Sequence, residues 1–167
     1  MSLDRRWIES RIPHRGSMCL LDEVVDWSTE RIRCRTRTHC AADNPLRADG
    51  RLGIACGIEY AAQAMAVHGA LWQEAVATTV GATAAGARAA GAATPVPAAG
   101  FLAGVRSVQF YAERLDDVPG DLICEAVRVA GDSGSALYEF ELHGADRTLL
   151  RGRATVVLDA SGQLMTP

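Results

Sequence analysis

The fold of this chain is built around the stretch Cys56-Gly57-Ile58-Glu59-Tyr60-Ala61-Ala62-Gln63-Ala64-Met65-Ala66-Val67. Its apolar residues recur at helical spacing and it contains no proline, so it predicts a helix that continues to about Trp72 or a little beyond. Glu59 and Gln63 are four residues apart and therefore project from one face of that helix. Because the rest of its surface is apolar, most of this helix needs cover from other parts of the chain.

Composition points to one domain spanning residues 1–167 with a sizeable core. The chain is 49% hydrophobic, and its net charge of −3 gives no sign of a nucleic-acid or membrane partner. The five cysteines are irregularly spaced without a CxxC pair, so we expect no disulfide framework and no metal site. The charged residues 1–11 lack the apolar core of a signal peptide. We therefore expect a cytoplasmic protein with reduced cysteines.

The segments on both sides of the helix have the patterns of strands. Before it, 18–25 and the alternating 31–39 predict a hairpin, with four arginines on the outer face of the second strand. After it, four apolar segments separated by turn signals predict an antiparallel meander; they are 100–111, 122–129, 136–142 and 149–158. The whole pattern predicts an α+β fold in which a curved antiparallel sheet wraps one central helix.

The one low-complexity segment is the Ala/Gly-rich stretch at 81–99. Its glycines and prolines argue for a mobile loop or a frayed helix end, so we expect Gly81 to Pro97 to be poorly ordered. A lid over a site is the alternative for a long segment of this kind.

Three motifs, in order, resemble the β-hydroxyacyl-acyl-carrier-protein dehydratases, which have the hotdog fold. They are Ile12-Pro13-His14-Arg15 with the following Met18 to Val24, then Glu59-Tyr60-Ala61-Ala62-Gln63-Ala64, and last Val105 to Phe110 with Val118 to Leu122. Asn44-Pro45-Leu46-Arg47 together with Cys56-Gly57-Ile58-Glu59-Tyr60 is similar to the divergent dehydratase-like subunits of aryl polyene biosynthesis.

This resemblance implies a function, partners and a site. It implies elimination of water from a 3-hydroxyacyl thioester carried on the phosphopantetheine of an acyl carrier protein, without a cofactor. It implies a homodimer, or a heterodimer with another hotdog subunit. Glu59 corresponds to the family's acidic catalytic residue, which begins a helix in an apolar tunnel. We expect Glu59 to be mostly buried, with its pKa raised by desolvation.

One departure from the family affects catalysis. The family's catalytic histidine lies fourteen residues before the acidic residue, where this chain has Pro45, and no histidine lies between Asp43 and Glu59. His39, at the end of the second strand, is the candidate base by position. His14 is expected to hold its loop at the dimer edge and to contact substrate, with base catalysis as an alternative role.

Other candidate site groups surround the start of the helix. Gln63 would orient Glu59 or a water molecule. Backbone N–H groups near Gly53 and Gly57 could polarise the thioester carbonyl. Cys56 is either a low-pKa thiol at the helix N-terminus or a small core residue.

Two functional alternatives, and the role of one charged surface, remain open. The missing histidine favours a non-catalytic subunit that pairs with an active dehydratase. A thioesterase on the same fold would use the carboxylate to activate water. The four arginines of the second strand are either a solvated face or a surface that attracts an acidic carrier protein.

Overall fold

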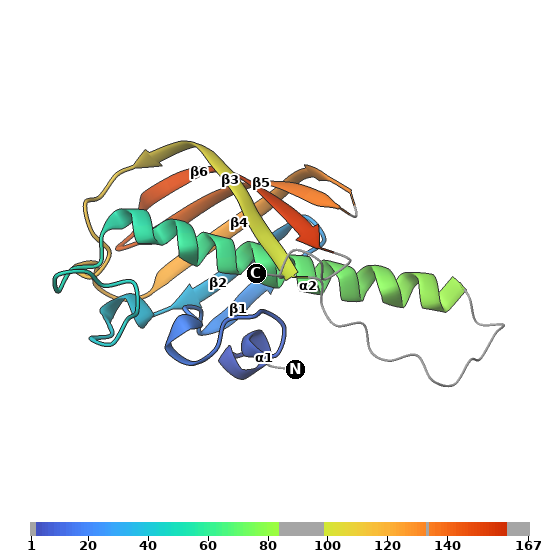
Figure 1. Ribbon diagram of the computed structural model, residues 1–167, viewed down its shortest axis with the longest axis horizontal. Coiled ribbons are helices and arrows are strands. Elements are labelled where there is room, and N and C mark those ends of the chain that lie inside the picture. Colours follow the sequence, from blue (N-terminus) through green and yellow to red (C-terminus); the bar gives the residue numbers. More distant parts are fainter. Residues whose placement is uncertain (1–2, 84–98, 133, 160–167) are drawn as a thin grey trace, which may run out of the picture.

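The computed structural model describes residues 3–83, 99–132 and 134–159. Its elements are the helices α1 (Arg5–Glu9) and α2 (Gly57–Thr83), three short 3-10 turns (Gly16–Met18, Thr38–Cys40 and Ile54–Cys56), and the strands β1 (Glu23–Trp27), β2 (Arg31–Thr36), β3 (Ala99–Phe110), β4 (Leu122–Gly131), β5 (Ser135–Gly144) and β6 (Arg147–Asp159). Figure 1 shows α2 crossing one face of a single curved sheet. The predicted hotdog architecture is confirmed.

All neighbouring strands are antiparallel, and their order is β1-β2-β4-β5-β6-β3. The predicted meander is correct for β4, β5 and β6 but wrong for β3. That strand pairs with β6 at the far edge, while β4 pairs with β2. Alternation identifies a strand but says nothing about its neighbours, so the crossover could not be predicted from it.

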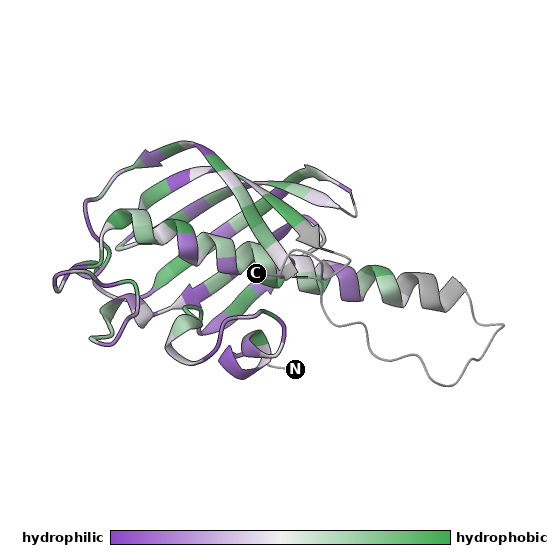
Figure 2. Cartoon of the chain, in the orientation of Figure 1, coloured by the Kyte–Doolittle hydropathy of each residue, from purple (hydrophilic) through white to green (hydrophobic). Residues whose placement is uncertain are grey.

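Helix α2 packs against β2, β3, β4 and β5. Figure 2 shows mixed hydropathy along the helix where it crosses the sheet, with apolar segments on the strands behind it. The helix ends at Thr83, well beyond the predicted end near Trp72. Alanine favours continuation of the helix after the sheet contact ends. The rest of the Ala/Gly-rich stretch, 84–98, lies outside the described residues, so its expected disorder stays a prediction.

The first turn of α2 approaches the sheet so closely that it requires a glycine. A Cβ atom built on Gly57 would lie 2.2 Å from Leu150 Cδ2 and 2.8 Å from Leu142 Cδ2. These distances are far below normal contact, and both leucines are fully buried core residues. Gly57 therefore sets how deeply the start of α2 sits on β5 and β6.

Carboxylates neutralise the arginines on the outer face of β2. Arg31 Nη2 lies 2.7 Å from Asp26 Oδ2, Arg35 Nη2 lies 2.7 Å from Glu23 Oε1, and Arg37 pairs with Asp121. The arrangement fits a solvated face of ion pairs better than an unpaired cationic surface for an acidic partner.

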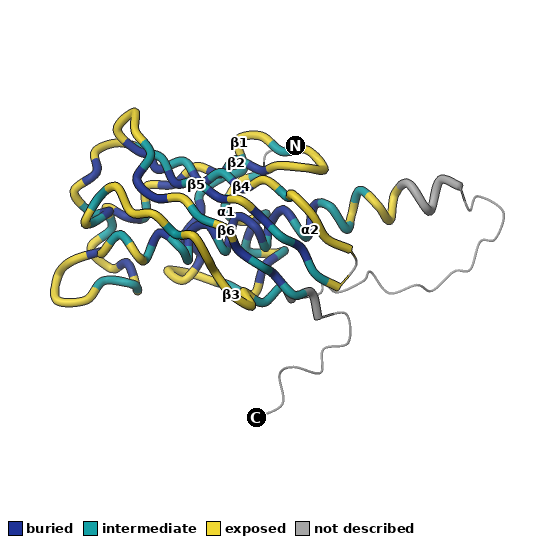
Figure 3. Tube along the Cα trace, turned by 90° about the horizontal axis from the view of Figure 1, so that it is seen from above, coloured by how far each residue is buried: buried dark blue, intermediate teal, exposed yellow. Residues whose placement is uncertain are grey.

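Strand β3 forms a long and exposed edge of the sheet, visible in yellow in Figure 3. Three of its apolar side chains are 40–48% exposed, namely Leu102, Val105 and Phe110. An edge strand with apolar side chains and unpaired backbone groups is a template for pairing with another strand. This edge has the properties of an interface.

We predict that the protein associates edge to edge through β3. Val105→Lys should weaken association by about tenfold or more, because it places a charge in the predicted contact between β3 edges. Val25→Lys is the matched control, since Val25 is 50% exposed on the opposite edge strand β1. Solution scattering at micromolar concentration measures the effect. A wild-type protein that is a monodisperse monomer would count against self-association.

We also predict that Gly57→Ala destabilises the fold by about 1–3 kcal/mol, because the added methyl group overpacks the core. Gly53→Ala is the control, because Gly53 has an ordinary extended backbone and open space at its Cβ position. Chemical denaturation of the two variants provides the measurement. Equal stabilities would contradict the packing role of Gly57.

Candidate active site

The first turn of α2 pairs Glu59 with a histidine from the loop after α1. His14 Nε2 lies 3.2 Å from Glu59 Oε1, and the two side chains are 28% and 34% exposed. The pair joins residues that are 45 positions apart in the sequence. His14 was predicted to contact substrate and hold its loop; its direct pairing with Glu59 was not predicted. Its place in the Pro13-His14-Arg15 motif was the only sequence signal for it.

Gln63 holds the other side of the carboxylate. It is fully buried, and its Oε1 accepts a hydrogen bond from Leu20 N–H at 2.8 Å. This bond orients the amide, so that Nε2 donates to Glu59 Oε1 at 3.0 Å and to Met18 O at 2.9 Å. The predicted i, i+4 relation thus acts as an orienting contact, which ties α2 to the 18–20 segment.

The electrostatics of Glu59 correct our expectation. Burial raises the pKa of Glu59, but hydrogen bonds from His14 and Gln63 and the charge of His14 together hold that pKa below its ordinary value. The side chain is also half-buried rather than mostly buried. Because the folded pKa is lowered, ionised Glu59 stabilises the fold above its ordinary pKa, and this contribution is lost as pH falls through the folded pKa.

The two oxygens of Glu59 therefore differ. Oε1 accepts hydrogen bonds from both His14 and Gln63. Oε2 has no hydrogen-bond partner among the described residues, and it is not among their buried unpaired atoms. A carboxylate held at one oxygen and open at the other can accept a proton at a defined point.

The loop that carries His14 is fastened on several sides. Arg5 Nη2 donates to the carbonyls of Gly16 and Cys19 at 2.8 and 2.6 Å. Glu9 Oε1 accepts from Gly16 N–H at 3.1 Å, and Gly16 adopts a positive φ of 55°. Side chains of α1 thus fix the loop in a conformation that places His14 beside the start of α2.

His39, the predicted base, is placed differently. It is fully buried, and its Nε2 lies 3.1 Å from the Val118 carbonyl and 3.2 Å from Cys40 Sγ. Burial lowers the pKa of His39, opposed by the bond to Val118. Among the described residues, no hydrogen bond or ion pair joins His39 to Glu59. Its catalytic role stays a prediction without a contact that supports it.

The backbone at the start of α2 offers a limited set of donors. The N–H of Gly57 is turned to the Ile54 carbonyl, and the N–H of Cys56 donates to Gly53 O at 3.0 Å. Within the described part of the chain, the N–H groups of exposed Gly53 and Ala55 have no acceptor. Of the two predicted glycines, Gly53 can offer a donor, whereas Gly57 serves packing.

Cys56 does not have the properties of an activated thiol. Burial raises its pKa, and its Sγ lies 3.6 Å from the Leu46 carbonyl. No group of three His, Cys, Asp or Glu side chains in the described ranges could hold a metal ion. Nor does any helix of those ranges have the length and hydrophobicity needed to cross a bilayer.

An apolar hollow lies farther along α2, on the side facing β3 and β5. Its lining includes Met65, Gly69, Trp72 and Tyr138, with Arg128 at one side. Glu59 does not line it; Met65 is about 9 Å farther along the helix axis, at 1.5 Å per residue. The carboxylate and this hollow therefore occupy successive positions along the same helix.

Comparison with known proteins agrees with this architecture. Residues 6–81 match the model of the ApeP-like family, described as ApeP dehydratase. The dehydratase heterocomplex ApeI:P from Xenorhabdus doucetiae contains a chain that is 21% identical, with a TM-score of 0.69 over 94% of this chain and 93% of that one. No curated protein sequence matches.

More distant structures share the fold. A thioesterase from Haemophilus influenzae is 9% identical with a TM-score of 0.51, covering 81% of this chain and 76% of its own. The PaaI protein of the E. coli phenylacetic acid degradation operon is 10% identical with a TM-score of 0.52, covering 80% of each chain.

The family match spans α1, the loop with His14 and almost all of α2, which are the segments that build the Glu59 site. The chain is a hotdog-fold protein, and its segment 6–81 is similar to the ApeP-like dehydratase family.

Proposed function

We propose that this protein acts on carrier-bound 3-hydroxyacyl thioesters and eliminates water to form the trans-2-enoyl thioester, in fatty-acid or polyene biosynthesis. The observation that carries the proposal is the Glu59–His14 pair at 3.2 Å, at the start of α2, within the segment that matches a dehydratase family. A carboxylate held ionised by a neighbouring histidine supplies the group that can take and return the proton in an elimination.

The proposed chemistry uses the open oxygen of Glu59. Oε2 accepts the α-proton as the Cα–H bond breaks, and that electron pair forms the Cα–Cβ double bond. The Cβ–O bond breaks, and the proton returns from Glu59 to the departing hydroxyl, which leaves as water. Protons and charge balance, because Glu59 begins and ends as a carboxylate.

The neighbouring groups have supporting roles in this proposal. His14 and Gln63 hold Oε1, so that the carboxylate is ionised and oriented at the start of the reaction. The free N–H groups of Gly53 and Ala55 are the candidate donors to the thioester carbonyl, where negative charge develops. In this proposal the histidine that acts beside Glu59, by holding Oε1, is His14 rather than His39, because His39 is held by the Val118 carbonyl.

The proposed partners are an acyl carrier protein and a second hotdog subunit. The exposed edge of β3 supports subunit pairing, and a heterocomplex is the form in which the ApeI:P dehydratase was solved. A non-catalytic role beside an active dehydratase is the alternative, favoured by the absence of a histidine from the 43–59 segment.

Thioester hydrolysis is the second candidate activity. Its supporting observation is the lowered pKa of Glu59, because an ionised carboxylate with one open oxygen can activate water. Saturated acyl thioesters separate the two activities, since they can be hydrolysed but cannot lose water.

We predict that Glu59→Gln abolishes elimination while the protein stays folded. The amide has the same shape but cannot shuttle a proton, so the rate should fall about 10²-fold or more. The measurement is formation of the enoyl thioester from a 3-hydroxyacyl substrate, alone and with a partner dehydratase. Glu141→Gln is the control, because Glu141 also pairs with a histidine at 3.2 Å but lies on β5.

Full activity of Glu59→Gln would overturn the catalytic assignment. Absence of activity in the wild type, both alone and with a partner, would favour the non-catalytic subunit. Release of free thiol from saturated and hydroxylated substrates alike would instead favour the thioesterase.

We further predict that His14→Ala raises the pKa of Glu59 towards its ordinary value, because the carboxylate loses a hydrogen bond and a neighbouring positive charge. The acid limb of the pH–rate profile should shift to higher pH. His143→Ala is the matched control, since it breaks a histidine–glutamate contact of equal length elsewhere. Carbon-13 NMR of the glutamate carboxyls measures the shift, and an unchanged Glu59 pKa in His14→Ala would contradict the pairing.

A further inference from the structure

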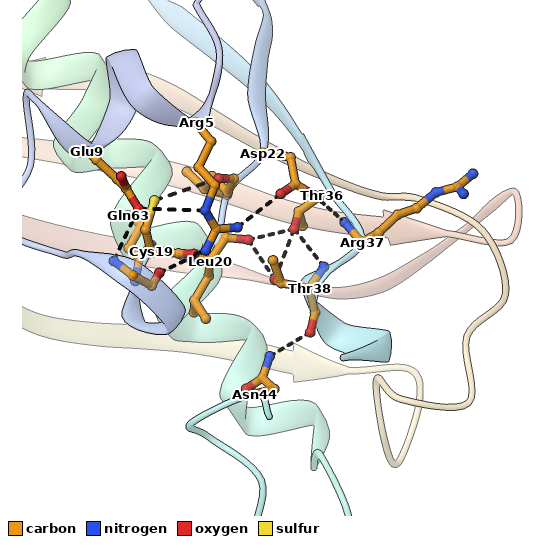
Figure 4. Close-up of polar contacts among 12 residues, drawn as sticks. Arg5, Glu9, Cys19, Leu20, Asp22, Thr36, Arg37, Thr38, Asn44 and Gln63 are labelled. Atoms are coloured by element: carbon orange, nitrogen blue, oxygen red, sulfur yellow. Dashed lines mark hydrogen bonds and ion pairs between the residues drawn. The ribbon is translucent and has the colours of Figure 1, made fainter. Parts of the chain in front are cut away.

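Leu20 is held by polar contacts on both sides of its α-carbon, as Figure 4 shows. Its N–H donates to Gln63 Oε1 at 2.8 Å. Its carbonyl accepts two hydroxyl hydrogen bonds, from Thr36 Oγ1 at 2.5 Å and from Thr38 Oγ1 at 2.7 Å. Leu20 is fully buried, so these contacts are shielded from water. A backbone segment gripped in this way has little freedom to move.

The hydroxyl of Thr38 connects Leu20 to a second group of polar residues. Asn44 Oδ1 accepts from the N–H of Leu46 at 3.0 Å, which orients the amide so that Nδ2 donates to Tyr60 Oη at 2.8 Å. The Tyr60 hydroxyl is then free to donate to Thr38 Oγ1, at 3.1 Å. Thr38 in turn donates to Leu20.

These contacts form two series of hydrogen bonds that meet at Leu20. The first runs from Asn44 through Tyr60 and Thr38 to the Leu20 carbonyl, and the second from the Leu20 N–H through Gln63 to Glu59 Oε1. Within each series, aligned hydrogen bonds polarise and strengthen one another. Between the series the link is positional, because the two peptide groups of Leu20 are joined through its α-carbon. The last acceptor of the second series is the carboxylate of the candidate site.

We propose that Thr38 is a positioning residue for Glu59, acting through Leu20 and Gln63 rather than by contact with the substrate. The catalytic part of this proposal rests on the function proposed above. The claim that Thr38 positions Glu59 does not rest on that function, because it concerns the orientation and protonation of Glu59 itself.

The arrangement assigns this role to Thr38 rather than to Thr36. Both hydroxyls donate to the Leu20 carbonyl, but only Thr38 also contacts Tyr60, a fully buried residue of α2 next to Glu59. Thr38 thereby joins three separate segments at one point: the end of β2, the 18–20 segment and the first turn of α2. Without its hydroxyl, Leu20 and the Gln63 amide lose part of the support that aims Nε2 at Glu59.

The test compares variants that remove one hydroxyl at a time. Thr38→Val keeps the shape and removes the donor, whereas Thr38→Ser keeps the donor. Tyr60→Phe removes the hydroxyl that contacts Thr38 Oγ1. Tyr138→Phe is its control, because Tyr138 is also a buried tyrosine whose hydroxyl contacts a ring nitrogen, His68 Nδ1, at 2.9 Å.

In Thr38→Val and Tyr60→Phe we expect the pKa of Glu59, read by carbon-13 NMR, to rise towards its ordinary value. The elimination kcat should fall about tenfold with KM changed by less than about twofold, because misorientation of a catalytic group affects the transition state more than binding. Thr38→Ser should keep the wild-type pKa and kinetics, and Tyr138→Phe should keep the wild-type pKa of Glu59.

A Glu59 pKa in both Thr38→Val and Tyr60→Phe equal to that of the wild type would overturn the proposal. A rise in Tyr138→Phe as large as in Tyr60→Phe would also overturn it, since the effect would then be a general loss of stability. If Thr38→Val does not fold, the comparison of the Glu59 pKa in Tyr60→Phe with that in Tyr138→Phe decides whether the proposal holds. If the wild type has no activity on any thioester, the proposed function fails, and the NMR titration still decides the positioning role.

Discussion

A helix of 27 residues that is apolar over most of its surface has to be covered, and the rest of this structure depends on that constraint. The six-stranded sheet curves over α2, and Gly57 lets the first turn sit directly on the leucines of β5 and β6. Close packing at this end brings the polar face of the helix up to the loop after α1. The candidate site therefore lies next to the close contact between Gly57 and the sheet.

The chemistry at that point is set by a competition between burial and hydrogen bonding. Half-burial alone would keep Glu59 protonated to higher pH, which is the state a resting general acid needs. His14 and Gln63 reverse this effect, so the resting group is a carboxylate. This reversal is why a proton shuttle, and as second choice the activation of water, fits the site better than an acid that starts out protonated.

Polar side chains in the interior also organise the loops of this molecule. Gln63 and Thr38 grip Leu20 from opposite sides, and Arg5 fastens the neighbouring carbonyls from α1. Gln63 is fully buried and its amide has partners, as buried polar atoms require. The loop between α1 and β1, which has no extended element of its own, gains from these contacts a single conformation.

The amino-acid sequence by itself determined the central helix, the number and limits of most strands and, through its motifs, the hotdog architecture. These features follow from local periodicity and from motifs, which can be read along the chain. The functional roles of Glu59 and Gln63 stay predictions. The position of β3 at the sheet edge, the pairing of His14 with Glu59 and the lowered pKa of that carboxylate were decided only by the tertiary structure. They depend on contacts between residues far apart in sequence, and on a balance of burial against hydrogen bonds that no spacing reveals. For the same reason the contacts of Thr38 could not be predicted from the sequence, because its hydroxyl meets Leu20 and Tyr60 only in the folded chain.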